Sequence, residues 1–168
     1  MNNLFSIQAV YFFLLVLLQV LIFNHINFLG YINPYIYLLF IAFFPVKNNR
    51  MLLIFLSFLL GLSIDLFLDT GGIHAAASVF IGYIRPLLLK FSFGTFYEHQ
   101  TVKFKTVDYG SKFIYLILTI ILHHIVLFSL EIFNFSEIYL ILQKTLFSSI
   151  FTILLCISIT IIFNRKNK

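Results

Sequence analysis

The chain has 168 residues, of which 61% are hydrophobic and 10% are charged. Soluble domains carry about 25% charged residues, and a short chain cannot hide this much apolar surface in one water-soluble core. The composition therefore excludes an ordinary soluble domain and indicates a membrane protein. We expect the formal net charge of +5 to come from cytoplasmic loops rather than from a nucleic-acid-binding surface.

Six apolar runs predict an all-α fold, with six transmembrane helices in one bundle and in a single domain. The first run lacks the basic start and the small-residue cleavage site of a signal peptide, so we predict an uncleaved span. The second run is short and lies between Pro34 and Pro45, and proline is tolerated in the first turn of a helix. The predicted spans are residues 4–23, 31–45, 51–69, 73–91, 112–132 and 138–163.

Six spans put both termini on one side of the membrane, and the loop charges indicate which side that is. Basic residues gather on the side of the termini: Lys47, Arg50, Lys90, Lys103, Lys105, Lys112, Arg165, Lys166 and Lys168. The other side carries Asp69, Glu131 and Glu137, with Lys144 near it. Because cytoplasmic loops are enriched in lysine and arginine, we predict that both termini are cytoplasmic.

Small and polar residues are concentrated on one face of the third span and one face of the fourth. Residues four apart share a helix face, and small residues at that spacing let two helices approach closely. We therefore predict a tight hairpin of these spans that crosses at Gly61 and Gly82, with a substrate groove as the alternative. The residues concerned are Ser57, Gly61, Asp65 and Asp69 in the third span, and Ala75, Ser78, Gly82 and Arg85 in the fourth.

Asp65 is the polar residue whose position most needs an explanation. An ionised carboxylate inside the membrane costs on the order of 2–3 kcal/mol unless it has a partner, so its side chain should face the bundle interior. Two alternatives are open for Arg85, which either meets Asp65 or is satisfied toward the cytoplasm. Asp69 is expected at the interface beside the turn that contains Gly72, because glycine permits a positive φ there.

The fifth span carries His123 and His124, and Glu131 shares a face with His124. We predict a hydrogen-bonded interior cluster of Asp65, His74, His124 and Glu131, with metal ligation or a proton relay as alternatives. The histidines lack the i, i+4 spacing of a zinc-binding helix, and no nucleophile elbow follows Gly61. The sequence therefore predicts no metal, no cofactor and no enzymatic activity.

These residues resemble the rod shape-determining protein MreD family. The resemblance rests on the basic turn before the third span, on Gly61-x-x-x-Asp65, on Gly71-Gly72 and on Gly82-Tyr83-x-Arg85. Pro34 in the short second span also fits, and the chain length and the six spans agree with the family.

The resemblance implies a component of the cell-elongation machinery in the bacterial cytoplasmic membrane. It would work with MreC, with the actin-like MreB filament, and with RodA and its class B penicillin-binding protein. The family brings no catalytic residues, so we expect a scaffold. The alternative is a substrate-binding subunit of a transporter for a vitamin-like molecule, because the family is distantly similar in fold to such subunits.

Overall fold

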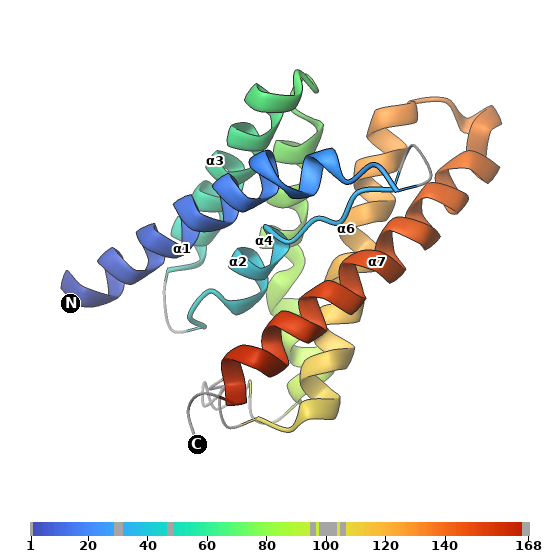
Figure 1. The fold of residues 1–168 in the computed structure, drawn as a ribbon. Helices are drawn as coiled ribbons and strands as arrows, with labels where there is room; N and C mark the ends of the chain where they lie inside the picture. Colours follow the sequence, from blue (N-terminus) through green and yellow to red (C-terminus); the bar gives the residue numbers. More distant parts are fainter. Residues whose placement is uncertain are drawn as a thin grey trace.

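In the computed structural model the chain forms a bundle of helices (Figure 1). The structure describes residues 2–28, 32–46, 49–94, 97, 104 and 107–165, with the backbone alone for 2–6, 135 and 163–165. The helices are α1 (Asn2–Leu21), α2 (Leu38–Phe43), α3 (Arg50–Leu68), α4 (Ile73–Phe93), α6 (Tyr109–Ile132) and α7 (Ile138–Arg165). Two short 3₁₀ turns, η1 (Phe23–His25) and η2 (Phe135–Glu137), follow α1 and precede α7.

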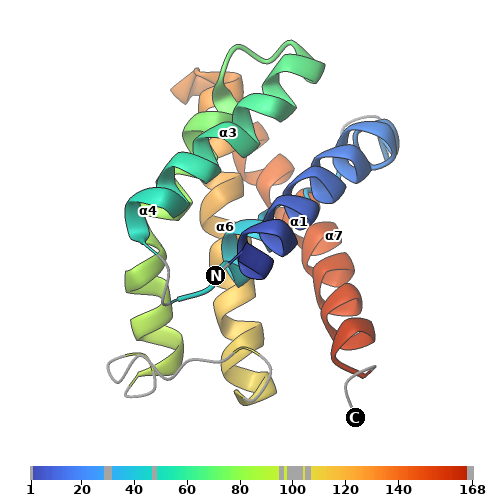
Figure 2. The same ribbon diagram turned by 90° about the vertical axis from the view of Figure 1, so that its left-hand side faces the viewer.

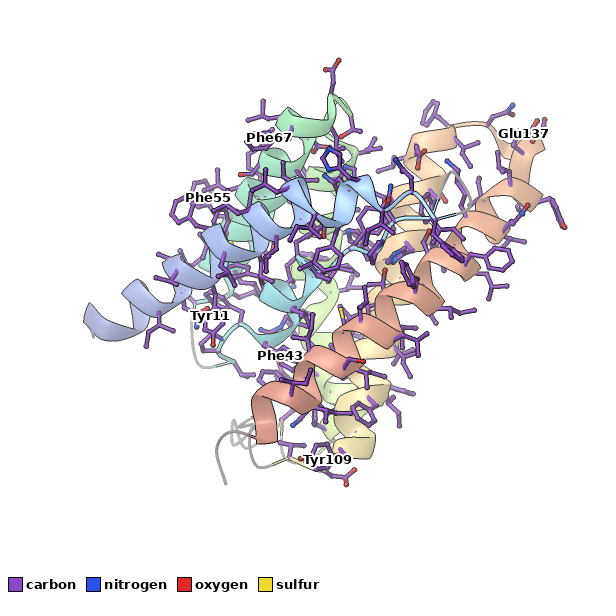
Figure 3. All side chains as sticks on the ribbon, viewed as in Figure 1. Tyr11, Phe43, Phe55, Phe67, Tyr109 and Glu137 are labelled. Atoms are coloured by element: carbon purple, nitrogen blue, oxygen red, sulfur yellow. The ribbon has the colours of Figure 1, made fainter. Side chains whose placement is uncertain are left out.

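Five of these helices are long and apolar enough to cross a membrane. The predicted all-α fold class is confirmed for the residues that the structure describes. The five long helices begin and end within three residues of the first, third, fourth, fifth and sixth predicted spans. Large apolar side chains cover their outer surfaces, as Phe55 and Phe67 on α3 illustrate (Figure 3).

The turns between the helices are fixed by caps that the local sequence supplies. The side chain of Asn49 accepts a hydrogen bond from the backbone of Met51 at the start of α3, and Asp108 accepts one from Ser111 at the start of α6. Such bonds satisfy amide groups that have no partner within the helix. At the end of α3, Asp69 adopts a left-handed conformation (φ +54°), and Gly72 (φ +99°) then precedes α4.

The packing follows the order of the chain. α3 lies against α4, α4 against α6, and α6 against α7, while α1 crosses obliquely over α2 and α3 (Figures 1 and 2). The turn after α3 and the connection between α6 and α7 lie at the upper end in Figure 1. α1 begins and α7 ends in the lower half of that view, and the long helices from α3 to α7 alternate in direction.

The prediction of a second membrane-spanning helix over residues 31–45 is wrong, because residues 32–46 do not form such a helix. They are mostly non-helical, apart from α2, which has six residues. Six residues rise about 9 Å along a helix, which is far short of a bilayer. The segment nevertheless runs from the upper end of α1 to the lower end of α3, through the middle of the bundle (Figure 1).

The interior position of this segment explains how a non-helical chain can occupy that depth. Residues 34–42 are all buried, and Tyr37, Ile41 and Ala42 have no exposed surface. Non-helical backbone is tolerated at membrane depth only where protein surrounds it and satisfies its polar groups. The segment therefore depends on its neighbours for hydrogen bonds that a helix would make within itself.

Several predictions from loop charge lie outside the described residues. They concern Lys47, Lys103, Lys105, Lys166 and Lys168. The acidic residues of the opposite side are described, and Glu137 lies at the upper end of the bundle, opposite to Tyr109 at the start of α6 (Figure 3).

Candidate functional site

The hairpin of α3 and α4 is as tight as the small residues predicted, but its register differs from the prediction. A β carbon on Gly61 would lie 2.4 Å from the carbonyl oxygen of His74 and 2.5 Å from Cα of Ala75. A β carbon on Gly82 would lie 2.9 Å from Oγ of Ser57. The prediction that Gly61 and Gly82 cross each other is therefore wrong, because each glycine faces a different turn of the partner helix.

Asp65 is buried at the upper end of this hairpin, where it caps α4. One carboxylate oxygen accepts from the backbone N–H of His74 at 3.0 Å, and the other accepts from that of Ala75 at 2.8 Å. The hydroxyl of Thr70 and Nδ1 of His74 also bond the first oxygen, at 2.5 and 3.0 Å. The first amides of a helix lack partners within it and carry partial positive charge, so a carboxylate there is stabilising.

This arrangement gives the buried carboxylate a structural role. Asp65 belongs to α3 and caps α4, so it ties the two helices together across the turn that contains Asp69 and Gly72. Arg85 makes no ion pair with it, so the predicted alternative of an Asp65–Arg85 pair is wrong.

Three histidines and two tyrosines form an aromatic cluster at the centre of the upper half of the bundle. The members are Tyr35, Tyr37, His74, His123 and His124, and we call them the histidine–tyrosine cluster. Their ring centroids lie 5.2–6.4 Å apart in the contacting pairs. The hydroxyl of Tyr37 is hydrogen-bonded to Nε2 of His123 at 3.0 Å. The cluster joins the buried segment to α4 and α6.

His124 continues the cluster toward α7 through a chain of hydrogen bonds. Its Nδ1 lies 2.6 Å from the carbonyl oxygen of Ile120, and its Nε2 lies 3.3 Å from the hydroxyl of Thr152. The same hydroxyl accepts from the backbone N–H of Tyr35 at 3.1 Å. These directions fit a neutral imidazole, which donates from Nδ1 and accepts at Nε2. Thr152 thereby satisfies a buried amide of the segment that has no helical partner.

Gln19 of α1 holds the same segment from the opposite side. Its amide oxygen accepts from the backbone N–H of Ile36 at 2.9 Å, and its amide nitrogen donates to the carbonyl of Pro34 at 2.9 Å. The nitrogen also donates to the side chain of Asn24 at 2.9 Å. One side chain thus substitutes for two backbone partners that a helix would have supplied.

Arg85 and Tyr115 hold the lower end of the segment. The guanidinium of Arg85 donates to the hydroxyl of Tyr115 at 3.0 Å, to the carbonyl of Ala42 at 3.1 Å, and to the carbonyl of Phe44. The hydroxyl of Tyr115 donates to the carbonyl of Ala42 at 3.0 Å. The last carbonyls of α2 are therefore satisfied from α4 and α6, where a cation is also favoured by the helix dipole.

Two of the candidate residues lie outside the interior polar groups, which was expected for Asp69 at the turn after α3 but not for Glu131. Glu131 is more than one-third exposed, and it pairs at the upper surface with Lys144 at 2.7 Å, so its predicted place beside His124 is wrong. Asp69 forms the left-handed end of α3 and contributes its backbone to that turn. The structure does bring together Asp65 and His74, and it places His124 in the same interior.

Sequence reasoning missed the residues that hold the buried segment, which are Gln19, Tyr115 and Thr152. Gln19 had a usable signal, because a glutamine inside an apolar run should face the protein interior. Tyr115 and Thr152 had none, because tyrosine and threonine are ordinary residues of membrane helices. Within the described ranges, no three histidine, cysteine or acidic side chains are grouped so that they could hold a metal ion.

Comparison of the chain with protein families, with curated proteins and with solved structures finds no match. The resemblance to the MreD family therefore rests on the residues quoted for it above. In this fold, those residues pack or bond helices against one another.

Proposed function

We propose that this protein is a non-enzymatic component of the bacterial cell-elongation machinery, as the resemblance to the MreD family implies. In this role it lies in the cytoplasmic membrane with both termini inside. It acts as a scaffold that keeps MreC, the MreB filament, and RodA with its class B penicillin-binding protein in one complex.

One observation carries this proposal: three residues on which the resemblance rests hold helices to one another. Gly61 allows α3 to approach α4, Asp65 caps α4, and Arg85 binds the end of α2. A scaffold needs a rigid interior of this kind, whereas a catalyst needs reactive groups turned toward a substrate. Partners would then be bound on the outer helix surfaces and on the short connections.

Deletion of the gene in a rod-shaped host tests the proposal. We expect rounded cells, and we expect MreC to co-purify with the tagged protein in mild detergent. Rod shape should return with the wild-type chain and with Ile64→Val, a conservative change at a buried position of α3 that leaves the outer surface unchanged. It should not return with Gly61→Val, whose side chain would collide with the backbone of α4. Normal rods after a clean deletion would contradict the proposal.

A substrate-binding subunit of a transporter is the second candidate, and one observation favours it. Nε2 of His74 and Nδ1 of His123 are buried and have no hydrogen-bond partner among the described residues. Such atoms could bind a small polar ligand in the histidine–tyrosine cluster. Retention of a small molecule by the purified protein, lost in the double variant Asp65→Asn, His124→Ala, would support this function. Full function of that double variant would argue against it.

A further inference from the structure

A second polar feature lies beside the lower half of α4 and includes Arg85. A cavity of about 100 Å³ opens between the start of α3, the lower part of α4 and the end of α2. Arg50 and Arg85 both line it. Of the described residues around it, none is acidic. The volume is enough for several water molecules or for one compact anion.

Arg85 places a buried positive charge at this cavity. Its side chain is 4% exposed, and its described acceptors are two backbone carbonyls and a tyrosine hydroxyl. These described partners satisfy hydrogen bonds, but they are neutral, so none of them compensates the formal charge. A buried charge is costly unless an opposite charge accompanies it, particularly at membrane depth.

Arg50 adds a second positive charge on the open side of the cavity. Its guanidinium donates to the carbonyl of Tyr83 at 2.9 Å and lies 4.9 Å from the centre of that ring. Pro86 lies inside α4 and has no backbone N–H, so this turn of α4 lacks one of its helical hydrogen bonds. Two arginines that line one cavity attract an anion, because like charges in a low-dielectric cleft reinforce each other's field.

The remaining wall and the position of the cavity point to a lipid. Apolar side chains, among them Val46, Leu53 and Leu89, form much of the remaining lining. Arg50 is the first residue of α3, and 19 residues rise about 28 Å, close to the thickness of the hydrocarbon core. Arg50 therefore lies where α3 reaches the level of the headgroups, whereas Arg85 lies deeper, about 12 Å before the end of α4. Arginine binds phosphate through two parallel hydrogen bonds, and basic pockets between membrane helices hold anionic headgroups.

We propose that the cavity between Arg50 and Arg85 binds the phosphate of an anionic phospholipid, whose acyl chains then lie against the apolar wall. The site shares Arg85 with the interior contacts of the proposed scaffold, but lipid binding is measured on the purified chain and does not depend on a role in cell elongation. The ligand would compensate the charge of Arg85 and fasten the end of α2 to α3 and α4.

The test measures the thermal unfolding midpoint of the full chain in detergent, as short-chain phosphatidylglycerol is added. Phosphatidylcholine of the same chain length, and inorganic phosphate, form the comparison arms. We expect phosphatidylglycerol to raise the midpoint well below the concentration at which either comparison does. Arg50→Gln should need at least tenfold more phosphatidylglycerol for the same rise. Lys144→Gln, which removes one positive charge at the upper surface, should respond like the wild type.

Equal responses of Arg50→Gln and the wild type would overturn the proposal, as would an equal response to phosphatidylcholine. An equal response to inorganic phosphate would overturn the assignment to a lipid and leave a site for free anions. Arg85→Lys keeps the charge but loses the planar fork, so it should also weaken the response. Should that variant fail to fold, Arg50→Gln decides alone, because Arg50 is exposed.

Discussion

At the scale of single residues, Asp65 shows how a buried charge in a membrane helix is accommodated without catalytic chemistry. Its two oxygens receive four hydrogen bonds, two from the first turn of α4 and two from the side chains of Thr70 and His74. Charge-assisted bonds of this kind are about twice as strong as neutral ones. The carboxylate therefore stabilises the hairpin at the place where the chain reverses.

Removal of this carboxylate should destabilise the protein. We expect Asp65→Ala to lower the free energy of unfolding by about 2–4 kcal/mol, because two helix amides and His74 lose their acceptor. Asp65→Asn should cost less, because its amide oxygen still accepts. Thermal unfolding in detergent measures both, with Asp69→Asn as the control, since asparagine tolerates the left-handed conformation of that position. An unchanged midpoint in Asp65→Ala would contradict the capping role.

At the scale of elements, the decisive feature is the buried segment of residues 32–46. A helix as short as α2 is not stable by itself in isolation, and just before it the carbonyls of Ile36 and Tyr37 accept only short turn bonds, from Leu39 and Phe40. Side chains of α1, α4, α6 and α7 supply the missing partners, through Gln19, Arg85, Tyr115 and Thr152. Four helices thus converge on one segment, which links their positions.

Loss of one partner should loosen the whole segment. Tyr115→Phe removes the hydroxyl between Arg85 and the Ala42 carbonyl, and leaves two buried polar groups with fewer bonds. We expect a loss of about 1–3 kcal/mol in unfolding free energy. Hydrogen exchange should also become faster at the amides of residues 35–42. Tyr139→Phe is the matched control, because Tyr139 is 79% exposed. Equal stability of the two variants would show that the Tyr115 hydroxyl does not hold the segment.

At the scale of the whole molecule, five long helices and one mostly non-helical segment run between the two ends of the bundle. The connections between them therefore lie at one end or the other. The connection between α6 and α7 lies at the upper end, and the start of α6 lies at the lower end (Figure 1). Positive charge in the loops predicts that the lower end is cytoplasmic.

Thiol labelling in intact cells tests this orientation. A membrane-impermeant reagent should label Asn134→Cys from outside, and should label Gly110→Cys only after the membrane is made permeable. The native Cys156 has no exposed surface, so the wild-type chain should remain unlabelled and serve as the control. Labelling of both variants from the same side would contradict the arrangement, and the reverse pattern would invert the orientation.

The sequence alone determined the fold class, the membrane environment and the bounds of the five long helices. These follow from the length and spacing of apolar runs, which depend on local composition. It also determined the tight approach of α3 and α4, because small residues four apart leave room for a backbone and for little else.

The tertiary structure alone decided the form of residues 32–46 and the partners of the interior polar groups. An apolar run between two prolines has the same sequence pattern whether it becomes a helix or a buried, mostly non-helical segment. The difference lies in distant side chains, such as Thr152 for Tyr35 and Tyr115 for Ala42, which can satisfy the backbone only after the helices pack. The partner of Asp65 was hidden for the same reason, since the amides of His74 and Ala75 become available to it only when α3 and α4 meet.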